Sequence, residues 1–190
     1  MSRKIILIGA STGGPNTVCE ILKNFPKDIP PVVVCIHMPA SFTKQLAERI
    51  NNECNFVAKE AKTGDILKKG MLYLCRGGVQ TRIIQTLQGF EFVVEDIGRI
   101  GGYLPSIDYT FSSISEVVNP RMLIGVLLTG MGTDGAKALK EMHDGGAFII
   151  TQDEESSVVY GMPKVAFDMG ASDIQLDFRE IGIYLHNKFM

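Results

Sequence analysis

The chain has 190 residues, 45% of them hydrophobic, so it is long enough to build one buried core. Its 19 basic and 21 acidic residues give a formal net charge of −2 without a basic run, which argues against nucleic acid or an anionic membrane surface as a partner. No apolar segment approaches the roughly 20 residues that span a bilayer, and no signal-peptide core follows the amino terminus. We therefore expect one cytoplasmic domain over residues 1–190, without membrane insertion.

Short apolar runs alternate with amphipathic segments, a pattern typical of an α/β protein. The predicted strands are residues 5–8, 32–36, 56–58, 71–75, 122–128, 147–151 and 174–176. The predicted helices are residues 16–24, 41–50, 107–118, 136–143, 163–169 and 179–188. Residues 82–86 and 90–94 predict an antiparallel hairpin. We expect a doubly wound, mostly parallel sheet with helices on both faces and this hairpin at one edge.

The first predicted strand leads into Gly9-Ala10-Ser11-Thr12-Gly13-Gly14, just ahead of a helix. The spacing Gly9-x-Ser11-x-Gly13 matches the nucleophile elbow, in which glycines allow a sharp turn that presents a serine near a helix N-terminus. A dinucleotide site fits less well, because it needs glycine at position 11 and an acidic residue where the second strand ends in His37. A P-loop would need Gly-Lys-Ser/Thr, which is missing here. The hexapeptide alone leaves open that Ser11 is a turn residue without chemistry.

Among the three histidines, His37 is the best candidate for a general base, because it follows the second predicted strand at the edge of the sheet where Ser11 is expected. His143 lies at a helix end and His186 in the last helix, where neither needs a catalytic role. Asp134 follows another long apolar strand and can orient the His37 ring, with Asp108 as its rival. Simpler interpretations stay open: a loop histidine at His37, and a helix N-cap at Asp134.

In these loops the sequence resembles the catalytic domain of the chemotaxis protein-glutamate methylesterases, the CheB-type family. The similar blocks occur in the family's order over nearly the whole chain, at residues 8–14, 37–39, 105–108, 129–136, 152–154 and 158–163. The resemblance implies a Ser-His-Asp triad of Ser11, His37 and Asp134. It also implies that Thr12 lies beside the nucleophile and that Met131 takes part in the oxyanion hole.

The resemblance implies hydrolysis of γ-glutamyl methyl esters on chemoreceptor cytoplasmic helices, to glutamate and methanol. Ser11 would attack the ester carbonyl, and His37 would pass the serine proton to the departing methanol and then activate water. Some family members also deamidate receptor glutamines. No cofactor or metal is implied. The four cysteines are widely spaced and lack a Cys-x-x-Cys pair, so reduced thiols are expected.

Two positions depart from the family's pattern. Gln80 stands where a histidine is usual, and Leu104 stands where an arginine is common. Both are expected in loops near the cleft, so the alternative function is a catalytically weak receptor-binding module of the same fold. The family usually carries a receiver domain ahead of the catalytic domain. None is expected in residues 1–190; such a domain either acts in trans, has been removed, or is missing from a free-standing esterase.

Overall fold

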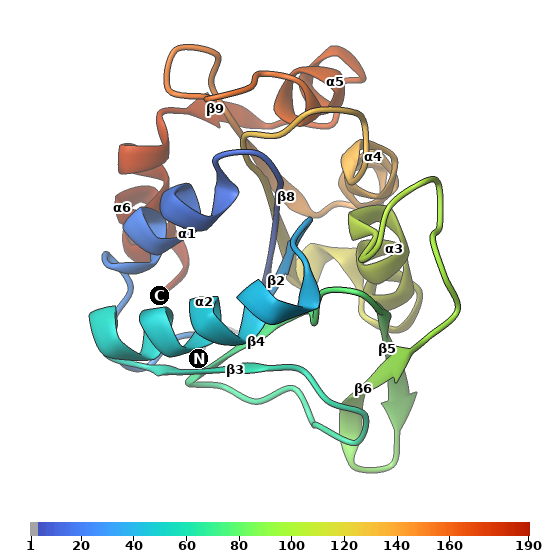
Figure 1. Cartoon of the computed structure of the whole chain (residues 1–190). Coiled ribbons are helices and arrows are strands. Elements are labelled where there is room, and N and C mark those ends of the chain that lie inside the picture. The colour runs from blue at the N-terminus through green and yellow to red at the C-terminus, as the bar shows by residue number, and fades with distance from the viewer. Residues whose placement is uncertain (1–3) are drawn as a thin grey trace.

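A computed structural model describes residues 4–190, and its centre is a seven-stranded sheet (Figure 1). The strand order is β3-β4-β2-β1-β7-β8-β9, and all neighbouring strands run parallel. The sheet strands are β1 (Ile5–Ala10), β2 (Val32–Ile36), β3 (Val57–Glu60), β4 (Met71–Leu74), β7 (Leu123–Leu127), β8 (Phe148–Gln152) and β9 (Ile174–Leu176). The predicted α/β class is therefore confirmed.

Helices cover both faces of the sheet (Figure 1). They are α1 (Gly14–Leu22), α2 (Ala40–Glu53), α3 (Ile107–Val117), α4 (Ala136–Asp144), α5 (Met162–Asp168) and α6 (Phe178–Phe189), with a 3₁₀ turn at Pro120–Met122. Helices α1, α2 and α6 pack on one face, and α3, α4 and α5 pack on the other. Every residue of β1, β2 and β7 is buried, which explains why these strands read as continuous apolar runs rather than alternating ones.

The hairpin is separate from the main sheet, contrary to the expectation that it forms one edge. Strands β5 (Gln80–Thr86) and β6 (Gly89–Glu95) form a two-stranded sheet of their own, which β6 extends by a single bridge between Glu91 and Ile66, while β3 and β9 are the edges of the large sheet. Ile83 and Phe92 bury the apolar face of the hairpin in the same core as α3, and the Ile83 N–H donates to Ser113 Oγ of α3 at 2.9 Å. Packing against a helix thus replaces pairing with a sheet edge.

The strand order reverses at β1, which places the loops after β1, β2 and β7 together. After β1 the chain forms β2, β3 and β4 on one side, with β4 inserted between β2 and β3, and it later forms β7, β8 and β9 in order on the other side. In open parallel sheets, ligands bind at the carboxyl ends of the strands beside such a reversal. Within residues 4–190, no helix is both long and apolar enough to cross a membrane.

Candidate active site

Ser11 lies at the carboxyl end of the central strand, between segments that follow β2 and β7. Ala10 is the Cα partner of Ile36, and the His37 N–H donates to the Ala10 carbonyl at 3.2 Å. On the other side, the Ser11 N–H donates to the Thr129 carbonyl at 2.9 Å. Because neighbouring strands lie about 4.8 Å apart, this register places Ser11 directly beside His37, as strand order predicted.

Glycines make the Ser11 turn sterically feasible. Gly13 has φ of +83° and precedes α1, a conformation that residues with a side chain rarely adopt. The Gly14 N–H donates to the Ser11 carbonyl at 2.8 Å, which closes the turn. A Cβ atom on Gly130 would lie 2.6 Å from Ser11 Cβ, so the segment after β7 can approach the serine only with glycine at this position. The glycines thus hold a half-buried serine at the start of a helix.

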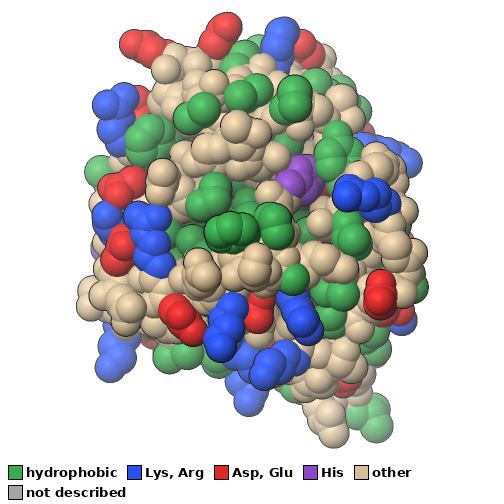
Figure 2. Space-filling model, viewed as in Figure 1, with side chains coloured by type: hydrophobic (Ala, Val, Ile, Leu, Met, Phe, Trp, Pro, Cys, Tyr) green, Lys and Arg blue, Asp and Glu red, His purple; other side chains and the backbone are tan. Residues whose placement is uncertain are grey.

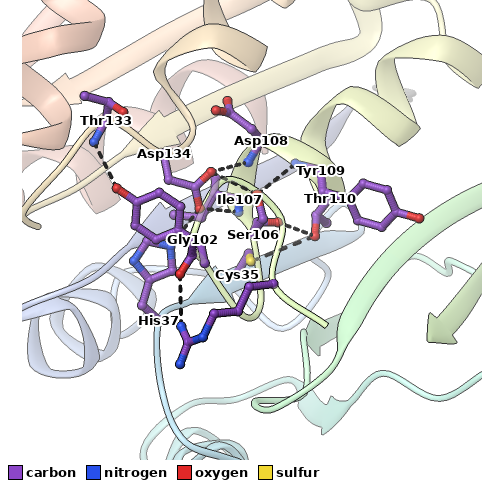
Figure 3. A network of polar contacts seen from close by, with 12 residues as sticks. Cys35, His37, Gly102, Ser106, Ile107, Asp108, Tyr109, Thr110, Thr133 and Asp134 are labelled. Atoms are coloured by element: carbon purple, nitrogen blue, oxygen red, sulfur yellow. Dashed lines mark hydrogen bonds and ion pairs between the residues drawn. The ribbon is translucent and has the colours of Figure 1, made fainter. Parts of the chain in front are cut away.

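His37 contacts Asp134 through one ring nitrogen. Its Nε2 lies 2.7 Å from Asp134 Oδ2, and the two side chains point toward each other in Figure 3. The His37 side chain is 15% exposed, against 2% for Asp134. Nδ1 is therefore the ring nitrogen left for a nucleophile, although within residues 4–190 no hydrogen bond joins His37 to the Ser11 hydroxyl. One face of the imidazole ring stacks on the ring of Tyr103, with centroids 4.7 Å apart and planes inclined by 16°.

Asp134 is the best-anchored polar group of the site. Besides His37, it accepts hydrogen bonds from Ser106 Oγ at 3.0 Å, the Ile107 N–H at 2.7 Å and the Asp108 N–H at 2.9 Å (Figure 3). These donors form the N-terminus of α3, where the helix dipole also favours an anion. Burial raises the pKa of Asp134, but the hydrogen bonds from His37 and from the α3 backbone outweigh it and leave the pKa below its ordinary value. The carboxylate is thus held ionised beside the imidazole.

The structure also places the rival residues. Asp108 accepts a hydrogen bond from the Ala138 N–H of α4 at 2.8 Å, and burial raises the pKa of its carboxyl group, whereas the carboxylate in contact with His37 is that of Asp134. Asp134 does not cap the helix it precedes, because Gly135 occupies the N-cap of α4. His143 Nε2 lies 3.4 Å from Asp173, and His186 Nδ1 contacts the Asn24 carbonyl at 3.0 Å. Both histidines therefore contact residues other than Ser11 and Asp134.

Free backbone donors lie next to Ser11. Within residues 4–190, the N–H groups of Thr12 and Met131 donate to no protein acceptor. Thr12 follows Ser11 directly in the sequence. Met131 follows Gly130, which packs against Ser11. Unpaired backbone N–H groups beside a nucleophilic serine are candidates for stabilising an oxyanion. Met131 is 71% exposed.

Gln80 organises the loop that carries Tyr103 and Ser106. It is fully buried, and its Nε2 donates to the carbonyls of Gly98 at 2.9 Å and Tyr103 at 3.0 Å, while its Oε1 accepts from the Ser106 N–H at 2.8 Å. Gln80 thus joins Gly98, Tyr103 and Ser106 through three hydrogen bonds. Gln80 is the first residue of β5 rather than a loop residue, contrary to expectation, and it does not line the pocket beside His37, whereas Leu104 does.

A shallow pocket opens beside the imidazole. It has a volume of about 340 Å³ and is lined by His37, Met38, Pro39, Gly78, Arg99 and Leu104. Hydrophobic side chains gather in the middle of the face shown in Figure 2, and Lys, Arg, Asp and Glu side chains surround them.

Among the described residues, no group of three or more His, Cys, Asp or Glu side chains is placed to hold a metal ion, and the four cysteines are free thiols.

Comparison with known proteins places this arrangement in a family. The family model described as CheB methylesterase matches residues 6–185. The chain belongs to the CheB methylesterase family. The CheB methylesterase catalytic domain of Thermotoga maritima superposes with a TM-score of 0.93 at 35% identity, covering 98% of this chain and 99% of that one. The fold deduced from the sequence is thus the CheB catalytic fold.

Curated relatives in the CheB family are longer than this chain. A protein-glutamate methylesterase/protein-glutamine glutaminase of Syntrophomonas wolfei is 42% identical over 182 residues, which are 96% of this chain and 53% of that protein. One from Sulfurimonas denitrificans is 43% identical over 172 residues, 90% of this chain and 49% of that protein. The chain therefore spans about half the length of these relatives.

Sequence reasoning missed three residues that lie around His37 and Asp134. Tyr103 stacks on His37, Ser106 hydrogen-bonds Asp134, and Arg99 lines the pocket. Ser106 lies in a family-like block, which was the available signal for it. Arg99 and Tyr103 lie in a glycine-rich loop whose course has no periodicity, so no local pattern indicated their positions.

Proposed function

We propose that this chain is a serine hydrolase that removes methyl groups from γ-glutamyl methyl esters of proteins, with Ser11, His37 and Asp134 as its triad. The observation that carries the proposal is the 2.7 Å contact between His37 Nε2 and the anchored carboxylate of Asp134, one strand away from Ser11. The names of the curated relatives support the substrate class.

In the first half of the reaction, the Ser11 hydroxyl attacks the ester carbonyl while His37 Nδ1 takes its proton. Asp134 holds the proton on Nε2, so Nδ1 is the basic nitrogen. The negative charge of the Asp134 carboxylate then stabilises the imidazolium that forms. The N–H groups of Thr12 and Met131 stabilise the oxyanion of the tetrahedral intermediate. Collapse breaks the bond to the methoxy oxygen, which receives the proton from His37 and leaves as methanol.

In the second half, water attacks the glutamyl ester on Ser11 while His37 takes a proton from it. The tetrahedral intermediate releases the Ser11 oxygen, which regains a proton from His37, and a glutamate carboxylate is the product. One ester and one water give one glutamate and one methanol. The same steps convert a glutamine side chain and water into glutamate and ammonia, so deamidation of receptor glutamines belongs to the proposal.

We propose methylated helices of chemoreceptor cytoplasmic regions as the substrate, and hence the cytoplasm as the place of action. The test measures methanol release from a methyl-esterified receptor fragment by the parent chain, Ser11→Ala and a control, Ser115→Ala. Ser115 lies on α3 and its hydroxyl bonds only the Ser112 carbonyl at 3.0 Å. Release by the parent and the control but not by Ser11→Ala supports the proposal. Release by Ser11→Ala at the parental rate, or by none of the three proteins, refutes it.

A further inference from the structure

The pocket beside His37 carries a single permanent charge. Among its lining residues, Met38, Pro39 and Leu104 are apolar and Gly78 offers only backbone, so the guanidinium of Arg99 is the one group that is charged at every physiological pH. Arg99 is exposed, and no carboxylate of residues 4–190 lies within ion-pairing distance of it; the same holds for Arg76 and Arg121, neither of which lines this pocket. What distinguishes Arg99 is its position, because it lines the same pocket as His37 and its charge is free to bind an anion.

Arg99 is partly held in place. One guanidinium nitrogen, Nη1, donates to the Gly102 carbonyl at 2.9 Å, and the loop on both sides is fixed by the hydrogen bonds of Gln80 to Gly98 and Tyr103. The backbones of Ile100 and Tyr103 also pair with each other in both directions at 3.0 Å. The remaining donors of the guanidinium stay available, and a planar fork of this kind matches the two oxygens of a carboxylate.

We infer that Arg99 determines substrate specificity by binding an acidic side chain that lies one helical turn from the reactive glutamyl ester. This inference rests on the proposed function and identifies what surrounds the ester in a preferred substrate. Side chains three or four residues apart on a helix are about 5–6 Å apart at Cβ. His37 and Arg99 line one pocket, so an ester at His37 brings the neighbouring side chain of the same helix face to Arg99.

The apolar part of the pocket favours glutamate for this neighbouring position. Its two methylene groups can pack against Met38 and Leu104 while the carboxylate reaches the guanidinium. A neutral side chain of similar length fills the same space but leaves Arg99 unpaired. The preference is electrostatic, so it weakens as ionic strength rises and the exposed pair is screened.

The test uses a chemoreceptor cytoplasmic fragment with one methylated glutamate, in two forms. In one form glutamates flank the ester at three and four residues; in the other they are replaced by methionine, which has similar length and is not a substrate. KM and kcat for methanol release are measured for the parent chain, Arg99→Gln, Arg99→Glu and a control, Arg121→Gln. Arg121 precedes β7 and thus lies at the amino-terminal ends of the parallel strands, opposite to the ends that carry Ser11 and His37.

We expect the parent and Arg121→Gln to show a KM roughly two- to fivefold lower for the glutamate form, a preference that shrinks at high salt. Arg99→Gln should lose this preference through KM, and Arg99→Glu should reverse it. If the parent treats both forms alike, or if Arg99→Gln raises KM equally for both, the inference is wrong. If the parent hydrolyses neither form, the proposed function itself fails.

Discussion

Asp134 Oδ2 lies 2.7 Å from His37 Nε2, and the same oxygen accepts the Ile107 N–H at the first turn of α3. One carboxylate thus connects two parts of the fold, the loop after β2 and the start of a helix that covers the sheet. Since Asp134 is 2% exposed, its position is set by four donors rather than by solvent. The orientation of the imidazole therefore depends on how α3 packs.

Replacing Asp134 with Asn should abolish most of the activity and destabilise the fold. The amide removes the charge that stabilises imidazolium, and it can turn its NH₂ group toward His37 and favour the wrong tautomer. We expect kcat to fall by on the order of a thousandfold or more. The amide also cannot accept from all four donors, which should cost about 1–3 kcal/mol of unfolding free energy. Ester kinetics and urea denaturation check both numbers; full activity in Asp134→Asn would exclude its role in the triad.

The pKa of Asp134 also predicts how stability varies with pH. Its pKa is lower in the folded chain than in the unfolded one, so below about pH 4 the unfolded state binds more protons and stability decreases as pH falls. The contribution is fully present above the unfolded value. The unfolding free energy of Asp134→Asn should therefore fall less steeply on acidification than that of the parent.

Asp108 provides a control of opposite sign. Burial raises the pKa of its carboxyl group, so the folded chain keeps the proton more readily, and ionisation of Asp108 costs stability as pH rises through its folded pKa. Asp108→Asn should remove that loss. Parallel pH profiles for the parent and Asp134→Asn would contradict the assignment of the low pKa to Asp134.

Tyr103 should support His37 through its ring rather than its hydroxyl. The two rings stack at 4.7 Å, whereas the hydroxyl makes only a 3.5 Å contact with the Thr133 N–H. Stacked aromatic pairs contribute about 0.5–1.5 kcal/mol, so Tyr103→Ala should lower kcat roughly two- to tenfold. Tyr103→Phe keeps the stack and should stay close to the parent. Equal losses in the two variants would assign the effect to the hydroxyl instead.

Gln80→Leu should damage the site without touching the cleft. The substitution keeps the size of the side chain but leaves the Ser106 N–H and the carbonyls of Gly98 and Tyr103 without their partner. Leaving such buried groups unpaired should cost about 1–3 kcal/mol of unfolding free energy, and kcat should fall because Tyr103 and Ser106 lose their fixed positions. Thermal unfolding and ester kinetics test this prediction. An unchanged stability would show that the loop does not depend on Gln80.

The sequence by itself determined the α/β class, the positions of the strands and helices to within a few residues, and the neighbouring positions of Ser11 and His37. These follow from short-range rules: apolar periodicity marks buried strands, glycines mark tight turns, and consecutive strands joined by one helix usually pair. Asp134 was a candidate because it follows a long apolar strand, with Asp108 as the alternative. The family blocks in the right order favoured Asp134 and added Thr12 and Met131.

Only the tertiary structure decided how these residues are held. Three contacts between segments distant in sequence hold them. Asp134 accepts a hydrogen bond from the first turn of α3, Tyr103 stacks on His37, and Gln80 donates to the Tyr103 carbonyl. The hairpin likewise packs on α3 instead of extending the sheet. Buried polar groups bond to the partners that packing brings within hydrogen-bonding distance. Those partners are far away in the sequence, so local periodicity does not predict them.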